Sequence, residues 1–379
     1  MAYRILLIGG GSGGHVFPLV AVAKALREAV LERAQDAELV MLGEGKFFKE
    51  AAEREAAQSV GFKFHSILAG KMRRYLSAVS FWDFVKMPIS LIQSFWYLFW
   101  IMPDAVFTKS GYASFFPVLA AKFFFIPIYL HDSDAVPGVT SKILGRWSKK
   151  VFISFEGARQ YFPESKTILV GNPVREGILT SSKEEALLFF KFSPTLPTVL
   201  ISGGSQGARN INNVVLESIV QLTNNFQVIH QCGKENFEQV SAAVNQIIKE
   251  GQDKYGEQVA ARYRVYPFFS DRELSLAYAM TDVIVGRSGS GTLFEVAALG
   301  KPGIVIPIKD SASNHQYFNA MEFTQYGGIM IEEDNLLGSI LVNEIIEAYQ
   351  KKEELGQAIR GFAKPDAARQ IAEEILSGI

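Results

Sequence analysis

Short apolar runs alternate with amphipathic segments through the first half of the chain. The runs at 3–9, 37–43 and 62–69 have the length and composition of strands. Between them, residues 18–34 and 46–60 are predicted to be helices, because their apolar positions recur at helical spacing. In the first of these helices the apolar positions are Val20, Ala23, Leu26, Val30 and Leu31.

The same alternation continues up to residue 173. Further apolar runs predict strands at 104–112, 126–134, 149–155 and 167–173, and a helix at 114–124. Strands and helices that alternate in this way are typical of a parallel sheet with helices on both faces.

The pattern restarts in the second half at residue 196. Strands are predicted at 196–202, 225–233, 263–269, 281–290 and 301–308. The glycine-rich stretch 10–14 aligns with the stretch 203–207, so each half opens with a strand, a glycine loop and a helix. The sequence therefore predicts an α/β chain of two Rossmann-like domains, with parallel sheets that face a central cleft.

The domain boundary is expected in the polar stretch between 172 and 197. We predict an N-terminal domain over 1–175, which faces the acceptor and a membrane, and a C-terminal domain over 176–355. Residues 356–379 include an amphipathic helix, which we expect to pack back on the N-terminal domain.

Composition and charge narrow the function classes. The formal net charge of −1 over 379 residues gives no electrostatic argument for nucleic acid. Cys232 is the single cysteine, so the sequence predicts neither an internal disulfide nor a cysteine cluster for zinc. The chain begins with a strand and without the shape of a signal peptide, which fits a cytoplasmic setting.

The opening glycine loop predicts an anion site. Glycines let the backbone approach a ligand closely, and the following helix directs free N–H groups and partial positive charge toward the loop. The letters Gly9-x-Gly11-x-x-Gly14 match the dinucleotide fingerprint, but Glu44 lies too far along for the acid that usually reads the ribose. A nicotinamide cofactor and a purely structural turn are the alternatives here.

Three later stretches offer groups for a nucleotide sugar. The loop at 203–212 contains Ser205 before a helix, and the junction at 286–308 places Glu295 about one turn into a helix, where it can accept hydrogen bonds from a ribose diol. The polar stretch 309–320 adds neutral side chains suited to sugar hydroxyls. Helix capping or dipole pairing is the alternative explanation for each.

The carboxylates after the strand at 126–134 argue weakly for metal. Asp132-x-Asp134 could chelate a divalent cation, yet no third carboxylate follows, and capping of a helix that begins near Gly138 explains the pair better. We therefore expect no metal site. Motifs of zinc and serine hydrolases are also lacking.

An apolar and aromatic segment spans residues 87–102 and carries no charged residue. It is shorter than the roughly 18–20 residues that a spanning helix needs. Basic residues at 71–74 and aromatic residues at 81–84 precede it. Two interpretations stay open: a buried core helix, or a basic and aromatic surface that lies against a membrane.

Six ordered blocks of the chain resemble the bacterial MurG glycosyltransferases, over residues 4–330. They are GGGSGGHVFPLVAVAKAL, HDSDAVPGVTSKIL, VGNPVREGI, GGSQGARNIN, RSGSGTLFEVAALGKPGIVIPI and HQYFNA. The resemblance implies the GT-B fold. It also implies transfer of N-acetylglucosamine from UDP-N-acetylglucosamine to lipid I, a muramyl-pentapeptide on undecaprenyl pyrophosphate, to form lipid II for peptidoglycan.

The resemblance also implies site residues. Acceptor contacts are expected from Gly11, Ser12, Gly13, Gly14 and His15. Donor contacts are expected from Ser12, Gly13, Gly14, Asp134, Arg175, Ser205, Phe269, Ser290, Gly291, Thr292, Leu293, Phe294, Glu295 and Gln316. Among these, Glu295 would bind the ribose, Gln316 would read the sugar, and Phe269 would lie beside the uracil. His15 and Glu295 are the expected catalytic residues.

The chain departs from the family at several of these positions. Ser12 stands where the family has threonine, and Phe269 where it has isoleucine. The family sequence HEQN is HDSD here, so that Asp134 replaces an asparagine that helps to hold the donor, and His315 replaces the first glutamine of a pair.

These observations lead to an inverting, metal-free sugar transfer as the expected reaction. Ser205, Arg175 and the helix after Gly207 would stabilise the departing UDP, and His15 would take the proton of the acceptor hydroxyl. In the alternative role, His15 positions the acceptor pyrophosphate. We expect no cofactor, no nucleic-acid partner, and a peripheral location on the cytoplasmic face of the membrane through residues 71–102.

Two alternative functions stay open. One is a related GT-B transferase that uses another lipid acceptor of the diacylglycerol type. The other is a nucleotide- or NAD-binding protein without transferase activity.

Overall fold

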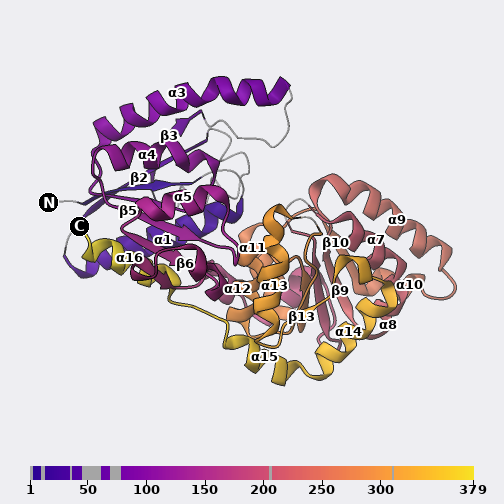
Figure 1. Cartoon of the computed structure of the whole chain (residues 1–379). Helices are drawn as coiled ribbons and strands as arrows, with labels where there is room; N and C mark the ends of the chain where they lie inside the picture. The colour runs from indigo at the N-terminus through magenta and orange to yellow at the C-terminus, as the bar shows by residue number, and fades with distance from the viewer. Residues whose placement is uncertain are drawn as a thin grey trace. The chain divides into compact units, whose positions relative to one another are not determined.

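The computed structural model describes residues 3–9, 13–34, 36–44, 61–68, 78–204, 207–309 and 311–379, with the backbone alone at 13–16, 44, 78–85, 176 and 312. The chain divides into two units (Figure 1). Unit 1 comprises Met1–Arg175 and Lys364–Ile379, and unit 2 comprises Glu176–Ala363. The helix predicted at 46–60 lies outside the described residues.

Unit 1 contains a parallel sheet of seven strands in the described residues, in the order β3-β2-β1-β4-β5-β6-β7. Its strands are β1 (Tyr3–Ile8), β2 (Ala37–Glu44), β3 (Lys63–Ile67), β4 (Ala105–Thr108), β5 (Ile128–Asp132), β6 (Lys150–Ile153) and β7 (Thr167–Leu169). Its helices are α1 (Gly13–Glu32), α3 (Ala78–Ile101), α4 (Phe115–Phe123), α5 (Val139–Trp147) and α16 (Ala367–Ser377).

The central strand β1 is apolar along its length because both of its faces are covered. Ile5 and Leu7 belong to a core cluster that includes residues of α1 and α16. Leu6 and Ile8 point to the opposite face and belong to a second cluster, with residues of α3 and α4. Alternate residues of a strand point to opposite faces, so the continuous apolar run is a consequence of two cores.

Unit 2 contains a parallel sheet of six strands in the described residues, in the order β10-β9-β8-β11-β12-β13. Its strands are β8 (Thr198–Ser202), β9 (Gln227–Gln231), β10 (Tyr263–Tyr266), β11 (Val283–Gly286), β12 (Gly303–Val305) and β13 (Ile329–Met330). Its helices are α6 (Lys183–Phe190), α7 (Arg209–Glu217), α8 (Ile219–Asn225), α9 (Phe237–Glu250), α10 (Gly256–Arg262), α11 (Asp271–Met280), α12 (Ser290–Leu299), α13 (His315–Thr324), α14 (Gly338–Gln350) and α15 (Lys352–Arg360).

The core of unit 2 is built in the same way. Val199 and Ile201 of β8 and Val285 of β11 pack with apolar residues of α7, α9 and α14. The predicted α/β class with two parallel, Rossmann-like sheets is therefore confirmed. In both units the loops that follow the strands at their carboxyl ends lie along one edge of the sheet, where such folds bind ligands.

The last helix of the chain belongs to unit 1. Ile371 and Ile375 of α16 are fully buried in the cluster that contains Leu19 and Ala23 of α1. Leu31 is an exception to the predicted apolar face of α1, because 73% of it is exposed.

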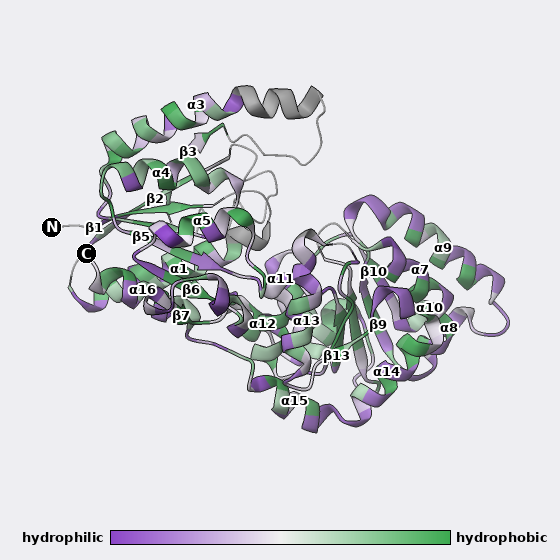
Figure 2. Cartoon of the chain, viewed as in Figure 1, coloured by the Kyte–Doolittle hydropathy of each residue, from purple (hydrophilic) through white to green (hydrophobic). Residues whose placement is uncertain are grey.

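Helix α3 is buried on one side and exposed on the other. Ser94 and Leu98 are fully buried, whereas Trp96 and Trp100 are 62% and 65% exposed. Figure 2 shows hydrophobic residues on much of the coloured part of α3, while α9 of unit 2 is largely hydrophilic. Among the described residues, none of the helices has the length and apolar character needed to cross a membrane.

Candidate active site

The loop after β8 is shaped by glycines. Gly204 and Gly207 have positive φ angles of 82° and 76°, which side chains other than glycine rarely adopt. A Cβ atom at Gly207 would lie 2.2 Å from the carbonyl oxygen of Cys232. The backbone at Gly207 can pack this closely only because glycine has no side chain. Ser205 lies in this loop but outside the described residues.

Two helices of unit 2 begin at this edge without side-chain caps. The N-cap of α7 is Ala208 and that of α12 is Gly289, and neither side chain caps its helix. A Cβ atom at Gly289 or Gly291 would have open space around it. The first N–H groups of both helices, with the positive end of each helix dipole, suit a phosphate group.

Glu295 lies in the second turn of α12 and is 5% exposed. Its Oε2 accepts a hydrogen bond from the Tyr278 hydroxyl at 2.9 Å. Tyr278 is itself buried on α11, so this bond fixes the orientation of the carboxylate. A carboxylate held in this way can accept hydrogen bonds from a diol.

The other residues expected in this loop divide by burial. Ser290, Gly291 and Thr292 are half-buried in the first turn of α12. Leu293 and Phe294 are buried, and the Phe294 ring lies 4.6 Å from the ring of Phe362. The side chains of Leu293 and Phe294 therefore support the helix from the core.

Phe269 is buried as well, with 3% exposure. Its ring centroid lies 5.0 Å from that of Tyr266 and 6.4 Å from that of Phe190. These contacts place the Phe269 side chain in an aromatic cluster beneath the loop that follows β10.

Gln316 is held at the start of α13 by three hydrogen bonds. Its Oε1 accepts from the backbone N–H of Ile308, its backbone oxygen accepts from Ser288 Oγ at 2.8 Å, and its backbone N–H donates to Ser311 Oγ. Since Oε1 faces the backbone, the amide Nε2 is the group that can donate to a ligand hydroxyl.

A buried ion pair connects the loops of unit 2. Arg287 Nη2 lies 2.7 Å from Glu333 Oε1, and the two side chains are 12% and 11% exposed. Arg287 also donates to the carbonyl of Ile306, while Glu333 accepts from Asn210 of α7 and from the backbone of Lys309. Burial opposes ionisation of Glu333, but the Lys309 N–H and the side chains of Arg287 and Asn210 lower its pKa.

The predicted residues of unit 1 are only partly described. Gly13 and Gly14 form the first turn of α1, while Gly11, Ser12 and the side chain of His15 lie outside the described residues. Arg175 is the last residue before unit 2, and its guanidinium carbon lies 4.3 Å from the ring centroid of Phe17.

The carboxyl edge of unit 1 also holds a charged cluster. Asp132 ends β5 and is 4% exposed, and its Oδ1 accepts from the backbone N–H of Asp134 at 3.1 Å. Lys109, which follows β4, is 2% exposed, and its Nζ donates to Asn172 Oδ1 at 2.8 Å.

Helix α5 begins at Val139 after Gly138, a residue without a side chain that could cap it, and Asp132 shares a side-chain hydrogen bond with Ser141 in the first turn of this helix. The capping role expected for the two aspartates stays a prediction. In the part of the chain that is described, no three histidine, cysteine or acidic side chains lie together as a metal site would require.

Four residues of these sites were not singled out from the sequence: Lys109, Tyr278, Arg287 and Glu333. A lysine directly after a fully apolar strand was the available signal for Lys109. The other three act through partners that are distant in sequence, so no local pattern identifies them.

Comparison with known proteins decides the family. The model of the glycosyltransferase family 28 N-terminal domain matches residues 5–153, and that of the C-terminal domain matches residues 198–375. A UDP-N-acetylglucosamine–N-acetylmuramyl-(pentapeptide) pyrophosphoryl-undecaprenol N-acetylglucosamine transferase of Treponema denticola is 33% identical, over 98% of this chain and 97% of its own. A Bacillus cereus protein of the same name is 31% identical over 98% and 99%.

The chain belongs to the MurG family. Its fold agrees with that of Acinetobacter baumannii MurG, with a TM-score of 0.72 at 23% identity and 99% coverage of both chains. A UDP-GlcNAc 2-epimerase from Neisseria meningitidis, whose structure contains UDP-GlcNAc, has a TM-score of 0.68 at 15% identity. The match covers 99% of this chain and 100% of the epimerase chain. The predicted GT-B class and glycosyltransferase activity are confirmed by these relatives.

The roles of individual residues are not tested by these comparisons. The MurG relatives establish the type of enzyme, while the assignment of His15, Arg175, Glu295 and Gln316 to steps of the reaction stays a prediction.

Proposed function

We propose that the chain transfers N-acetylglucosamine from UDP-N-acetylglucosamine to lipid I, the undecaprenyl-pyrophosphoryl muramyl-pentapeptide, and releases UDP. The full-length match to transferases whose names state this reaction carries the proposal. The uncapped starts of α7 and α12, with the buried Glu295 carboxylate, supply groups suited to a nucleoside diphosphate.

The reaction proceeds in one displacement with inversion at the donor sugar. The acceptor hydroxyl oxygen attacks C1 while the bond from C1 to the UDP oxygen breaks, and UDP leaves with that electron pair. Arg175, Ser205 and the N-terminus of α7 stabilise the charge that develops on the diphosphate. The proton of the acceptor hydroxyl passes to His15. No metal ion takes part, so a chelator leaves the rate unchanged.

Transfer of radiolabelled N-acetylglucosamine to a lipid I analogue tests the activity. Label is expected in the lipid I product and not in diacylglycerol, which serves as the alternative acceptor. Label in diacylglycerol alone would overturn the acceptor. UDP and UDP-N-acetylglucosamine should raise the melting temperature and NAD should not; binding without transfer would indicate a protein that only binds nucleotides.

Two variants test the residue roles. Glu295→Gln should lower kcat/KM for the donor by roughly 10- to 100-fold, because a hydrogen bond to a charged group is lost. His15→Asn should lower kcat by about 100-fold or more with little change in donor KM. A near-normal kcat would exclude His15 as the base and leave the positioning role.

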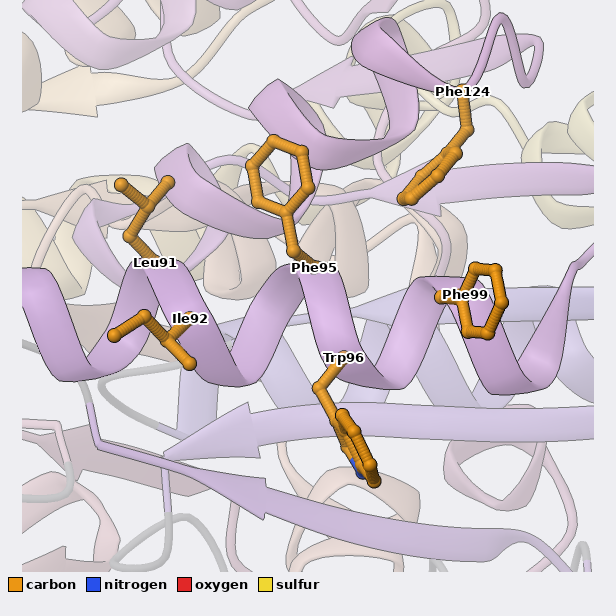
Figure 3. Close-up of a pocket in the computed structure, with 6 residues that line it drawn as sticks. All are labelled: Leu91, Ile92, Phe95, Trp96, Phe99 and Phe124. Carbon is orange, nitrogen blue, oxygen red and sulfur yellow. The ribbon is translucent and has the colours of Figure 1, made fainter.

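We also propose that unit 1 lies on the membrane surface, where the lipid acceptor is found. A groove of about 480 Å³ is lined by Leu91, Ile92, Phe95, Trp96, Phe99 and Phe124. Figure 3 shows that Leu91 and Phe95 point to one side of α3, whereas Trp96 points to the other. Phe125, which follows Phe124 in the chain, is 92% exposed, and the nearby Lys122 is also exposed. Exposed aromatic side chains beside a cation suit an anionic bilayer.

Sedimentation with anionic liposomes tests this surface. The chain should bind, and Trp96→Ser with Phe125→Ser should reduce the bound fraction. Leu188→Ser in α6 of unit 2 is the control, because this leucine is also largely exposed, at 80%. Equal binding by the folded double variant and the control would reject the surface on α3 and α4. We propose that this surface lies on the cytoplasmic face of the cell membrane.

A further inference from the structure

Lys109 is a buried cation at the centre of the carboxyl edge of unit 1. It follows β4, which pairs with β1 on one side and β5 on the other. Its backbone N–H donates to the carbonyl of Ile8 at 3.2 Å, so it lies directly beside the end of β1. An ammonium group that is 2% exposed is costly unless it has hydrogen-bond acceptors and negative charge nearby.

The acceptor is Asn172, from the loop after β7. Asn172 is 1% exposed, and its Oδ1 accepts from Lys109 Nζ at 2.8 Å and from Ser133 Oγ at 3.3 Å. Ser133 lies between Asp132 and Asp134, so Asn172 connects the lysine to this acidic turn. The loop with Asn172 is held in turn by His131, whose Nε2 bonds to the carbonyl of Gly171 at 2.9 Å.

The negative charge comes from the two aspartates. Burial lowers the pKa of Lys109 to about 7, and the carboxylates of Asp134 and Asp132 oppose this effect. The pKa of Asp132 is raised to about 6, first by burial and then by Asp134. The charges of Lys109 and of the two carboxylates therefore act on one another, and Asp132 also shares a side-chain hydrogen bond with Ser141.

We propose that Lys109 is a positioning residue and a determinant of specificity, which acts through Asn172 and through its charge on the turn from Asp132 to Asp134. Through Asn172 and Ser133 it holds the turn that carries Asp134 at the carboxyl edge. A carboxylate accepts hydrogen bonds and repels phosphate, so this turn selects a ligand group that donates, namely a sugar hydroxyl or an amide N–H. The proposal rests on the proposed function for the identity of that sugar substrate.

A double-mutant cycle on the full chain tests the coupling. Lys109→Met keeps most of the length of the side chain and removes the charge, and Asp134→Asn removes one negative charge. Lys109→Met should lower kcat/KM for the donor by roughly 10- to 100-fold, because the turn loses both a buried positive charge and the hydrogen bond to Asn172. The double variant Lys109→Met/Asp134→Asn should recover at least tenfold of this loss. Losses that simply multiply in the double variant would overturn the proposal.

Two binding measurements separate positioning from general damage. Lys109→Met should leave the affinity for UDP unchanged within twofold, since it alters neither Glu295 nor the starts of α7 and α12, while the KM for the sugar nucleotide rises. A parallel loss of UDP affinity would show that the variant acts on the whole fold and would overturn the specific role.

A double-mutant cycle on thermal stability tests the coupling even if the protein has no transferase activity. If wild-type protein transfers no sugar to lipid I, the proposed function fails, but the coupling is still measured by thermal unfolding. Lys109→Met should lower the melting temperature, and adding Asp134→Asn should restore part of it. An equal or larger drop in the double variant would overturn the charge coupling, even if Lys109→Met alone is too unstable for kinetics.

Discussion

The carboxyl edges of the two sheets carry different chemical groups. At the carboxyl edge of unit 1, Lys109 is buried, and the charges of Asp134 and Asp132 offset part of the burial that lowers its pKa. At the corresponding edge of unit 2, the starts of α7 and α12 present backbone N–H groups. Backbone donors carry no charge that needs a counter-ion, so the starts of α7 and α12 suit a diphosphate, whereas carboxylates such as those of the turn from Asp132 to Asp134 suit a group that donates hydrogen bonds.

The largest test of this contrast removes the ion pair between Arg287 and Glu333, which is largely buried at the edge of unit 2. Arg287→Met leaves the Glu333 carboxylate buried without its cation, and we expect the free energy of unfolding of unit 2 to fall by about 3–5 kcal/mol. Urea unfolding measures this loss. Lys309→Ala is the control, because its pair with Asp334 is exposed and should contribute less than about 1 kcal/mol. Equal losses in the two variants would mean that backbone geometry alone holds these loops.

A smaller effect tests the shape of the glycine loop. Gly207→Ala places a methyl group against the Cys232 carbonyl at a positive φ angle, and should destabilise unit 2 by about 2–4 kcal/mol. The melting temperature and the affinity for UDP should both fall. Gly291→Ala, where the added atom has open space, should leave the melting temperature almost unchanged. A stable Gly207→Ala protein would contradict the requirement for glycine.

Per pH unit, the smallest expected effect is the change in the free energy of unfolding with pH. This change should have opposite signs in the two units. Burial lowers the pKa of His230 in unit 2 to about 3, below its unfolded value near 6.5. The stability from neutral His230 is therefore present above pH 6.5 and is lost as the pH falls, by at most about 1.4 kcal/mol per pH unit. The raised pKa of Asp132 in unit 1 has the opposite effect, since its contribution grows as the pH falls from about 6 toward 3.8.

Calorimetric melts between pH 4 and 7 measure both slopes. His230→Gln should flatten the acid loss of unit 2, and Asp132→Asn should remove the opposite slope of unit 1. The same slope in wild type and His230→Gln would exclude His230 as its source. The hydrogen bonds of His230 with Tyr263 and Asn212 fit a neutral ring, in which one nitrogen accepts and the other donates.

The fold could be predicted from the sequence because its signals are local. Apolar runs, helical spacing and glycine-rich junctions can each be recognised within a short stretch of residues. These signals predicted the two parallel sheets, with β1 and β8 as the first strands of their units. Segment 87–102 shows where such signals fail. It is apolar on both sides of the helix, so hydropathy could not distinguish the buried Leu98 from the exposed Trp96.

The candidate site was predictable only where it follows a motif. Glu295, Gln316 and the glycines lie at strand–helix junctions that the sequence marks. Lys109 and Asn172 are 63 positions apart, and Arg287 and Glu333 are 46 apart. Their pairing depends on strand order and on loop packing, which composition and spacing do not encode.

The return of α16 to unit 1 has a consequence for biosynthesis. Ribosomes make a chain from its N-terminus, and all of unit 2, Glu176–Ala363, is made before the helix that completes the core around Leu19 and Ala23. Until residues 367–377 emerge, the apolar side of α1 lacks its cover, while unit 2 can already fold. Unit 1 therefore completes the core around α1 only after all of unit 2 has been made.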